Sequence, residues 1–471
     1  MLSVRDGGSI CCQEPAQSAE KGQGGADRVV AEAGGALTVS VIVPVHNGAA
    51  SLARCLAALV ASDYPHYECI VVDDGSTDDS RAIAARYPVA VVTLAGGPFG
   101  PAYARNRASE IARGDILFFV DADVIVSPEA IDQVAQVFRR HPDVDAVFGS
   151  YDENPESREF VSQYKNLFHH FVHQGSSEEG STFWSGCGAI RREVFLKMGG
   201  FDEKRYSHPS IEDIDLGCRM RAAGHRILLD KQIQVKHLKR WTLRGMTMSD
   251  VFDRGIPWTL LILRERNLPN DLNLRFSQRV SALLSYLLLL DLGLAALSSD
   301  VAALPLLAGL FLLAVGSWHW PQGVSPFRTN HRAELLSYLV LGAIVVLAVR
   351  LSNLGVLLPL APLAVGMLAG HWLPHSTRLW NRFFFTIMLM GLVVSLVLVL
   401  ASLPIWCVVP MLIILGLIAL LNYRLYAFFA RKRGVLFAAA AFPFQLLYYL
   451  YSVLAMAMGT GIYLWNNAVK R

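Results

Sequence analysis

With 471 residues, the chain is long enough to hold more than one domain. The net charge is only +3, and no basic stripe with interleaved aromatic residues is present, which argues against a nucleic-acid-binding protein. The seven cysteines form no paired Cys-x-x-Cys sets, so we do not expect a structural zinc site. An odd, scattered number of cysteines suits a reducing, cytosolic environment.

Composition divides the chain into four segments. Residues 1–37 have no apolar period and no secretory signal, and we expect a disordered tail. Residues 38–245 have the composition of an ordinary globular domain, and residues 246–278 mix apolar and basic side chains as amphipathic segments at a membrane surface do. Residues 279–471 are dominated by Leu, Val, Ala and Phe, which predicts an all-α transmembrane region.

Buried strands alternate with helices in the second segment. Apolar runs at 39–45, 68–73 and 116–120 predict strands, and an amphipathic helix follows the first of them, with Ser51 as its expected cap. This alternation predicts an α/β fold with right-handed crossovers and a mostly parallel sheet.

Acidic residues stand where two of these strands end. Asp121 and Asp123 follow one strand, and Asp74 follows another. Ligands bind at the carboxyl ends of parallel strands, and a pair of carboxylates there is costly unless a cation or hydrogen-bond donors satisfy it. Asp-x-Asp suits Mg²⁺, which takes one or two carboxylates together with phosphate oxygens. The alternative is an acidic turn, and the motifs that accompany these residues favour a ligand site.

A glycine-rich loop at 96–100 precedes a predicted helix that carries Arg105. The loop is not a P-loop, since the Gly-Lys-Ser/Thr element is absent. An arginine in the first turns after such a loop is placed to pair with a diphosphate. A solvated helix face is the alternative role for this side chain.

Several motifs stand in order along residues 38–241. They are VIVPVHN at 41–47, VVDDGSTD at 71–78, ARN at 104–106, DAD at 121–123, GCGAIRR at 186–192, GGFD at 199–202, IEDIDL at 211–216 and RMRAAGH at 219–225. Together they resemble the inverting family-two glycosyltransferases, which have the GT-A fold. The resemblance implies transfer of a sugar from a nucleotide-diphosphate sugar, with a divalent metal (Mg²⁺ or Mn²⁺) as cofactor.

The resemblance also implies roles for individual residues on the donor side. Asp74 would hold the nucleotide base, beside Pro44 and the turn through His46 and Asn47. Asp121 would meet the ribose, and Asp123 would bind the metal that bridges the diphosphate.

On the acceptor side, Asp213 would be the general base that deprotonates the acceptor hydroxyl. Glu212 precedes it, and a helix N-terminal pair favoured by the macrodipole is the structural alternative for both residues. Asp215, one turn into the same helix, is assigned to structure. Trp184 is a candidate for the acceptor wall, with a core position as the alternative.

The sequence HLKRW at 237–241 resembles the Gln-x-x-Arg-Trp element of membrane polysaccharide synthases and ceramide-type glucosyltransferases, with His237 in the place of Gln. A histidine near the end of a GT-A domain is often a metal ligand, and a structural role is the alternative here. Arg240 would meet the diphosphate and Trp241 would stack on the sugar or acceptor.

The third and fourth segments predict membrane association. About seven apolar stretches follow residue 279, and LLSYL at 283–287 recurs at 335–339, which suggests repeated helical hairpins. Arginines flank alternate ends of these stretches, so the positive-inside rule places the catalytic domain on the cytoplasmic face of a bacterial inner membrane. The expected partners are a nucleotide-diphosphate sugar, the bilayer and a lipid or lipid-linked glycan acceptor, without nucleic acid.

Three alternatives remain open on sequence alone. The chain would be a processive polysaccharide synthase if it extruded a polymer, although the replaced Gln argues weakly against that reading. It would be a transporter or scaffold if its soluble domain bound nucleotide sugars without turnover, although such a module needs no base at Asp213. A nucleotidyltransferase has no use for the membrane segment.

Overall fold

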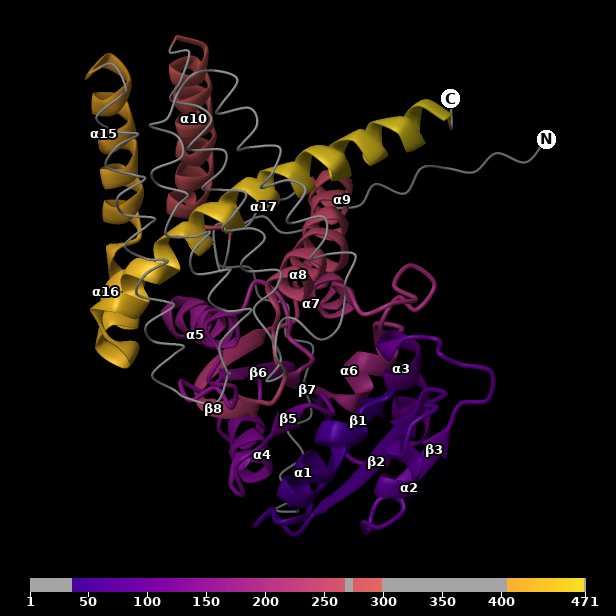
Figure 1. Cartoon of the computed structure of the whole chain (residues 1–471). Helices are drawn as coiled ribbons and strands as arrows, with labels where there is room; N and C mark the ends of the chain where they lie inside the picture. Colours follow the sequence, from indigo (N-terminus) through magenta and orange to yellow (C-terminus); the bar gives the residue numbers. More distant parts are fainter. Residues whose placement is uncertain (1–35, 267–273, 299–404, 470–471) are drawn as a thin grey trace, which may run out of the picture. The chain divides into compact units, whose positions relative to one another are not determined.

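The computed structural model describes residues 36–266, 274–298 and 405–469 (Figure 1). The expected disordered tail, apart from its last two residues, lies outside the described residues. The chain divides into two compact units, one of residues 1–279 with 424–471 and one of residues 280–423.

The first unit is built on one eight-stranded sheet in the order β3-β2-β1-β4-β7-β6-β8-β5. Its strands are β1 (Val39–Val45), β2 (Tyr67–Asp73), β3 (Ala90–Thr93), β4 (Ile116–Val120), β5 (Val124–Ile125), β6 (Ala146–Tyr151), β7 (Cys187–Arg191) and β8 (Ile227–His237). Strands β1 to β4 are parallel, as expected for an α/β fold.

The sheet is mixed, although its parallel pairings, which include β6 with β8, still outnumber the antiparallel ones, as the predicted mostly parallel sheet requires. Strand β7 runs antiparallel to both β4 and β6, and β5 runs antiparallel to β8. The chain returns from helix α5 (Phe160–Gly175) to the end of the sheet where β6 stops, so β7 starts there and pairs Cys187 with Val120. The residues just before β7 therefore lie at the same edge as those just after β4.

Helices cover both faces of the sheet. One face packs against α1 (Ala49–Val60) and α4 (Ala130–Arg140), and the other against α3 (Pro101–Ile111), α6 (Arg192–Lys197) and α7 (Glu212–Ala222). The short α2 (Ser80–Ala84) contacts α1. Helix α1 begins at Ala49, so the expected cap Ser51 lies inside it, where its hydroxyl donates to the carbonyl of Gly48 at 3.3 Å.

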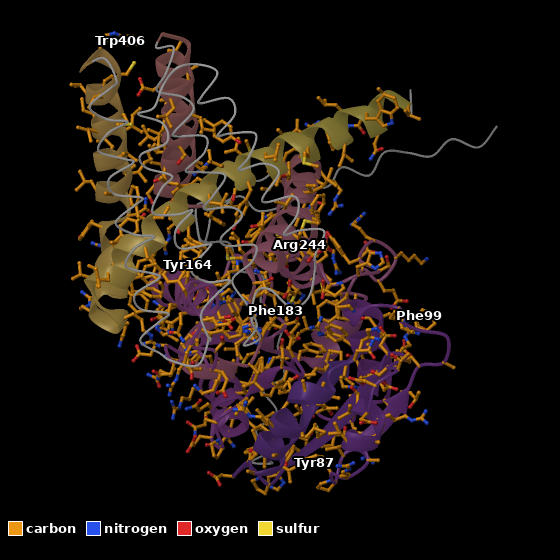
Figure 2. All side chains as sticks on the ribbon, in the orientation of Figure 1. Tyr87, Phe99, Tyr164, Phe183, Arg244 and Trp406 are labelled. Carbon is orange, nitrogen blue, oxygen red and sulfur yellow. The ribbon has the colours of Figure 1, made fainter. Side chains whose placement is uncertain are left out.

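A further helical layer covers α5. It contains α8 (Leu243–Met248), the π-helix η1 (Ser249–Gly255), α9 (Ile256–Glu265), α16 (Tyr423–Arg433) and the long α17 (Val435–Val469). Helix α17 passes over α5 and packs on η1 and α9 (Figure 1). Figure 2 shows Tyr164 of α5 beside α17, where its hydroxyl donates to Gln445 at 2.8 Å.

Small residues let α17 approach η1 and α9 closely. A Cβ added at Gly255 would lie 2.7 Å from the Cβ of Ala455, and one added at Gly459 would lie 2.8 Å from Thr259. Ala455 and Gly459 on α17 thus face Gly255, at the end of η1, and Thr259 on α9. Small residues four positions apart favour such close packing of helices.

The membrane prediction is supported only in part. Among the described residues, α17 alone is a single helix long and apolar enough to cross a membrane, and residues 406–421 with 423–433 reach that limit only as a pair bent by 70°. In the second unit, α10 (Phe276–Ser298) and α15 (Ile405–Leu421) are described, and the amide of Asn422 donates to the Ser281 hydroxyl at 3.0 Å. The four spans expected between residues 301 and 403 lie outside the described residues.

Candidate functional site

Three neighbouring parallel strands, β2, β1 and β4, end at one edge of the sheet. His46 follows β1, Asp74 follows β2 and Asp121 follows β4. This is the edge where open α/β sheets bind their ligands. The topology thus brings the residues predicted for the nucleotide and for the metal to one edge.

The second aspartate of the DAD motif lies next to His237. Because β5 pairs Val124 with His237, the imidazole stands beside Asp123, with Nε2 3.4 Å from the carboxylate Oδ2. The other ring nitrogen, Nδ1, lies 2.7 Å from the Oδ1 of Asn166. An amide oxygen only accepts hydrogen bonds, so Nδ1 carries the proton in that contact and the lone pair of a neutral ring is on Nε2.

Asp123 and His237 therefore present two electron-pair donors to each other across 3.4 Å. A proton or a cation between the two atoms would remove the repulsion between their lone pairs. Burial opposes ionisation of Asp123, but with a proton on Nε2 the hydrogen bond and charge of His237, together with the charge of Lys239, hold the pKa of Asp123 below its ordinary value. The donor set fits a divalent ion, since imidazole and carboxylate are both common ligands of Mn²⁺ and Mg²⁺ uses carboxylate.

Two protein ligands do not complete such a site. Within the described part of the chain, no three His, Cys, Asp or Glu side chains gather closely enough to hold a metal. The remaining ligands would have to be water or phosphate oxygens of a substrate, which is the usual arrangement for Mg²⁺ at phosphate-binding sites.

Arg105 connects the DAD motif to the Glu-Asp pair of α7. Its guanidinium is 4% exposed and donates to Asp121 at 2.7 Å and to Glu212 at 2.8 Å. Burial raises the pKa of Glu212 and the charge of Arg105 opposes that rise. The sequence predicted that Arg105 pairs with a diphosphate, whereas in the structure two carboxylates already occupy two of its nitrogens.

Asp213 lies in the first turn of α7, beside the segment that precedes β7. Its Oδ2 accepts hydrogen bonds from the backbone N–H of Ser185 at 3.0 Å and from the Ser185 hydroxyl at 3.2 Å. Since Gly186 in turn accepts from the N–H of Asp121 at 3.3 Å, the antiparallel start of β7 links the candidate base to the DAD motif. The side chain is half-buried, so it keeps access to solvent.

Trp184, predicted for the acceptor wall, is half-buried next to these groups. Its ring meets Tyr151 edge-on at 4.9 Å, and a Cβ added at Gly186 would lie 2.6 Å from the indole. Tyr151 also stacks on His237 at 4.3 Å with an interplanar angle of 7°. Aromatic rings thus join the acceptor side to the candidate metal site.

The turns on the nucleotide side are tied to one another. The carbonyl of Asp74 accepts from His46 Nδ1 at 2.8 Å, and Asn47, at φ 51°, accepts from the Thr77 N–H at 2.8 Å. Pro44 lies on β1, part-exposed, just before this turn.

The carboxylate of Asp74 is buried and already engaged. It accepts from the backbone N–H of Phe99 at 2.9 Å and from that of Gly100 at 2.7 Å, so it holds the glycine-rich loop. Figure 2 shows Phe99 on this loop at the rim of the domain. The predicted contact of Asp74 with a nucleotide base would have to use the lone pairs of its carboxylate that these two hydrogen bonds leave unoccupied.

The structure brings neither Arg240 nor Trp241 to an open face of the site. Arg240 forms an ion pair with Glu159, with its Nε 2.7 Å from the carboxylate. Trp241 is buried in a cluster with Tyr164 and Met246 under α16 and α17. The predicted stacking of Trp241 on a sugar therefore has no exposed ring face in this conformation.

Sequence reasoning did not identify Asn166, Ser185 or Tyr151 as site residues. Each touches a predicted residue, and each contact joins segments at least 28 positions apart. One feature of the sequence could have pointed to Asn166 as a functional residue, because asparagine is a poor helix former and this one lies inside the long α5. Its amide also donates to the backbone carbonyl of Ser162 at 2.9 Å. Asp215 is bound by Arg219 and Arg264, both at 2.9 Å, which fits the structural role expected for it.

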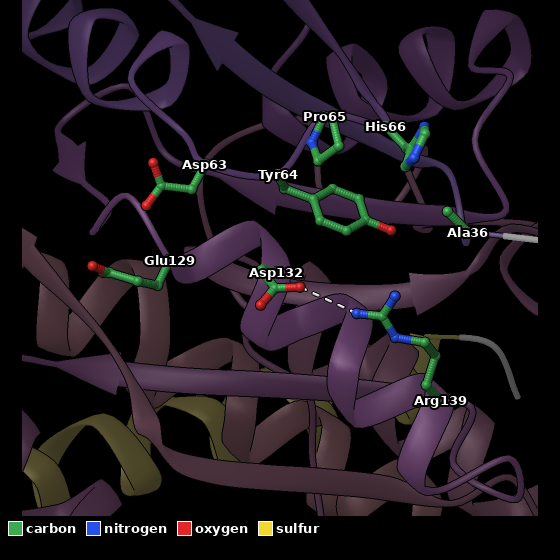
Figure 3. Close-up of a pocket in the computed structure, with 8 residues that line it drawn as sticks. All are labelled: Ala36, Asp63, Tyr64, Pro65, His66, Glu129, Asp132 and Arg139. Carbon is green, nitrogen blue, oxygen red and sulfur yellow. Dashed lines mark hydrogen bonds and ion pairs between the residues drawn. The ribbon is translucent and has the colours of Figure 1, made fainter.

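An open pocket lies elsewhere on the domain. Figure 3 shows the residues that line it, which include His66 just before β2, Tyr64 and the ion pair of Asp132 with Arg139 at 3.1 Å. It opens at the amino ends of β1 and β2, opposite the edge that carries Asp74 and Asp121. We therefore do not assign it to the candidate site.

Residues 40–199 match the model of the family Glycosyl transferase family 2. O-antigen biosynthesis protein RfbC of Myxococcus xanthus is 30% identical over 220 residues, which cover 42% of this chain and 17% of that protein. O-antigen chain rhamnosyltransferase WbaN of Salmonella anatum is 28% identical over 236 residues, which cover 46% of this chain and 73% of that protein. Mannosyltransferase PcManGT from Pyrobaculum calidifontis, solved with GDP-Man and Mn2+, is 18% identical over 77% of this chain and 86% of that chain, with a TM-score of 0.42. The chain thus contains a glycosyl transferase family 2 domain.

Proposed function

We propose that this chain transfers a sugar from a nucleotide-diphosphate sugar, with inversion, to a lipid or polyprenyl-linked glycan at the cytoplasmic face of a bacterial inner membrane. The observation that carries the proposal is the link between Asp123 and Asp213. Arg105 joins Asp121 to Glu212, and these two carboxylates stand two residues before the candidate metal ligand Asp123 and one residue before the candidate base Asp213.

Donor binding is assigned to the carboxyl ends of β1, β2 and β4. The base and ribose would lie along Pro44, Asp74 and Asp121. A Mg²⁺ or Mn²⁺ ion held by Asp123 and His237 would stabilise the negative charge that gathers on the leaving diphosphate. Asn166 keeps the Nε2 lone pair of His237 available for that ion.

Asp213 is assigned the role of general base. It would take the proton from the acceptor hydroxyl as the oxygen forms a bond to the anomeric carbon and the bond from that carbon to the diphosphate breaks. One in-line displacement inverts the configuration. Both hydrogen bonds from Ser185 would hold the Asp213 carboxylate in place for that proton transfer.

A membrane acceptor is supported by the helical layer on the catalytic domain. Met248 and Phe252 are exposed on one side of α8 and η1, and α17 exposes Leu454, Met458 and Ile462. Exposed apolar side chains in such numbers mark a membrane or lipid contact. Two relatives are named for O-antigen synthesis, which accords with a glycan acceptor.

Two rivals remain, a processive synthase and a binding module without turnover. A role of Asp213 as base would argue against the binding module, and the product of the assay below separates the proposed function from the synthase.

The test is turnover of sugar nucleotides by the full-length protein in detergent, with native membrane lipids and Mn²⁺ or Mg²⁺. We expect a lipid-extractable labelled product that EDTA abolishes. Asp213→Asn should lower the rate at least a thousandfold while it leaves donor binding within about threefold. Full activity in that variant would remove Asp213 as the base, and a water-soluble polymer would favour the synthase.

A further inference from the structure

A buried ion pair lies beside the candidate site and has no part in the mechanism above. The Nζ of Lys165, on α5, is 2.6 and 2.8 Å from the two carboxylate oxygens of Asp250 on η1. The hydroxyl of Tyr451, on α17, donates to the same carboxylate at 2.7 Å. Three elements thus meet at Asp250, and short hydrogen bonds already satisfy its carboxylate.

Two further cations surround this pair. Arg254, one turn after Asp250, is 42% exposed, and its guanidinium is 4.0 Å from that carboxylate, beyond hydrogen-bond distance. The Nζ of Lys239 lies 4.3 Å from the centre of the Trp241 ring, and no ion pair to a described carboxylate is present for it. Since Lys165 neutralises Asp250, Arg254 and Lys239 add positive charge to the cluster, and the charge of Lys239 also acts on Asp123.

The pKa of Lys165 agrees with this added charge. Burial lowers it below the ordinary value, Asp250 opposes that effect, and the charges of Arg254 and Lys239 add to it. A site that holds uncompensated positive charge, partly shielded from water, attracts an anion more strongly than an exposed arginine does.

The ring of Trp241 lies between this cluster and the candidate metal site. The Nζ of Lys165 is 5.9 Å from the Trp241 ring, whose centre is 6.4 Å from that of His237. The indole N–H of Trp241 is buried and donates to none of the described atoms. An anion here would lie next to the place where the leaving diphosphate is expected.

The side chains around these charges indicate the class of ligand to which the anionic group belongs. Met248 and Phe252, exposed on the turns that precede Arg254, and the exposed apolar side chains of α17 flank the charge. A ligand that fits has an anionic head and an apolar chain. The sugar donor does not fit, because it has no apolar chain and its own groups are assigned to β1, β2 and β4.

We propose that Arg254 and Lys239 bind the phosphate of an amphiphilic acceptor, a lipid phosphate or lipid diphosphate, and so hold it beside the transfer site. The ion pair of Lys165 with Asp250, locked by Tyr451, positions the helix that carries Arg254. This inference rests on the proposed function and names its acceptor class.

The experiment is binding, which requires no turnover. Farnesyl phosphate and farnesol, a matched pair that differ only in the phosphate, are titrated into the full-length protein in nonionic detergent. We expect wild type to bind farnesyl phosphate at least tenfold more tightly than farnesol. Arg254→Gln should lose that preference, whereas Arg254→Lys should keep most of it.

The matched control is Arg54→Gln, because Arg54 is similarly exposed, at 49%, and lies on α1. UDP and GDP are titrated into the same proteins. Equal farnesyl phosphate affinity in wild type and in folded Arg254→Gln would overturn the proposal. A loss of UDP or GDP binding as large as the loss of farnesyl phosphate binding would assign the site to the donor instead. Failure of sugar transfer with intact phosphate binding would reject the proposed function alone.

Discussion

The buried bridge through Arg105 supports a quantitative prediction about Arg105→Gln. The guanidinium is 4% exposed and Glu212 is 6% exposed, so the variant leaves a buried carboxylate without its cation. Removal of one partner from a buried ion pair costs about 3 to 5 kcal/mol. We expect a loss of stability in this range, together with loss of donor binding, because Asp121 loses the same partner.

An exposed ion pair provides the reference. Arg54 and Glu156 lie 3.2 Å apart with 49% and 45% of their side chains exposed, and such surface pairs contribute about 0 to 1 kcal/mol. Arg54→Gln should therefore shift the thermal unfolding midpoint of the full-length protein only slightly.

A double substitution isolates the interaction itself. Arg105→Gln with Glu212→Gln removes the unpaired buried charge as well as the cation, so it should unfold at a higher temperature than Arg105→Gln alone. The assay is thermal unfolding followed by intrinsic fluorescence, with donor binding measured by titration. If Arg105→Gln lowered the midpoint no more than Arg54→Gln does, the bridge would not be the buried connection that we describe.

Two further predictions concern metal affinity and helix packing. Asn166→Ala removes the acceptor of His237 Nδ1, so activity should require about tenfold or more metal for half-saturation, and an unchanged metal titration would count against His237 as a ligand. Gly459→Ala places a Cβ 2.8 Å from Thr259 and should lower the thermal unfolding midpoint. Gly461, two residues along the same helix, lies in open space, so Gly461→Ala should leave the midpoint unchanged or raise it. Equal effects of the two substitutions would show that α17 does not pack closely against α9 at Gly459.

The sequence alone predicted the parts of the site that local pattern controls. An apolar run that ends in Asp121 or Asp74 predicts both a buried strand and an acidic carboxyl end. Both predictions need only the few residues of the strand and the residue that follows it. The parallel order of β1 to β4 followed from the alternation of strands and helices. The helical position of Asp213 followed from its place before an apolar period.

The tertiary structure decided how these residues are used. Arg105 binds a glutamate 107 positions away, and the engagement of Asp74 with the 96–100 loop and the burial of Trp241 also depend on contacts between distant segments. No local pattern encodes such pairings, since hydrogen bonds and packing partners are selected only when the sheet and helices close on one another. The antiparallel β7 is the clearest case, because its direction, which puts Ser185 beside Asp213, is fixed by the path of the chain around α5 and not by any residue within the strand.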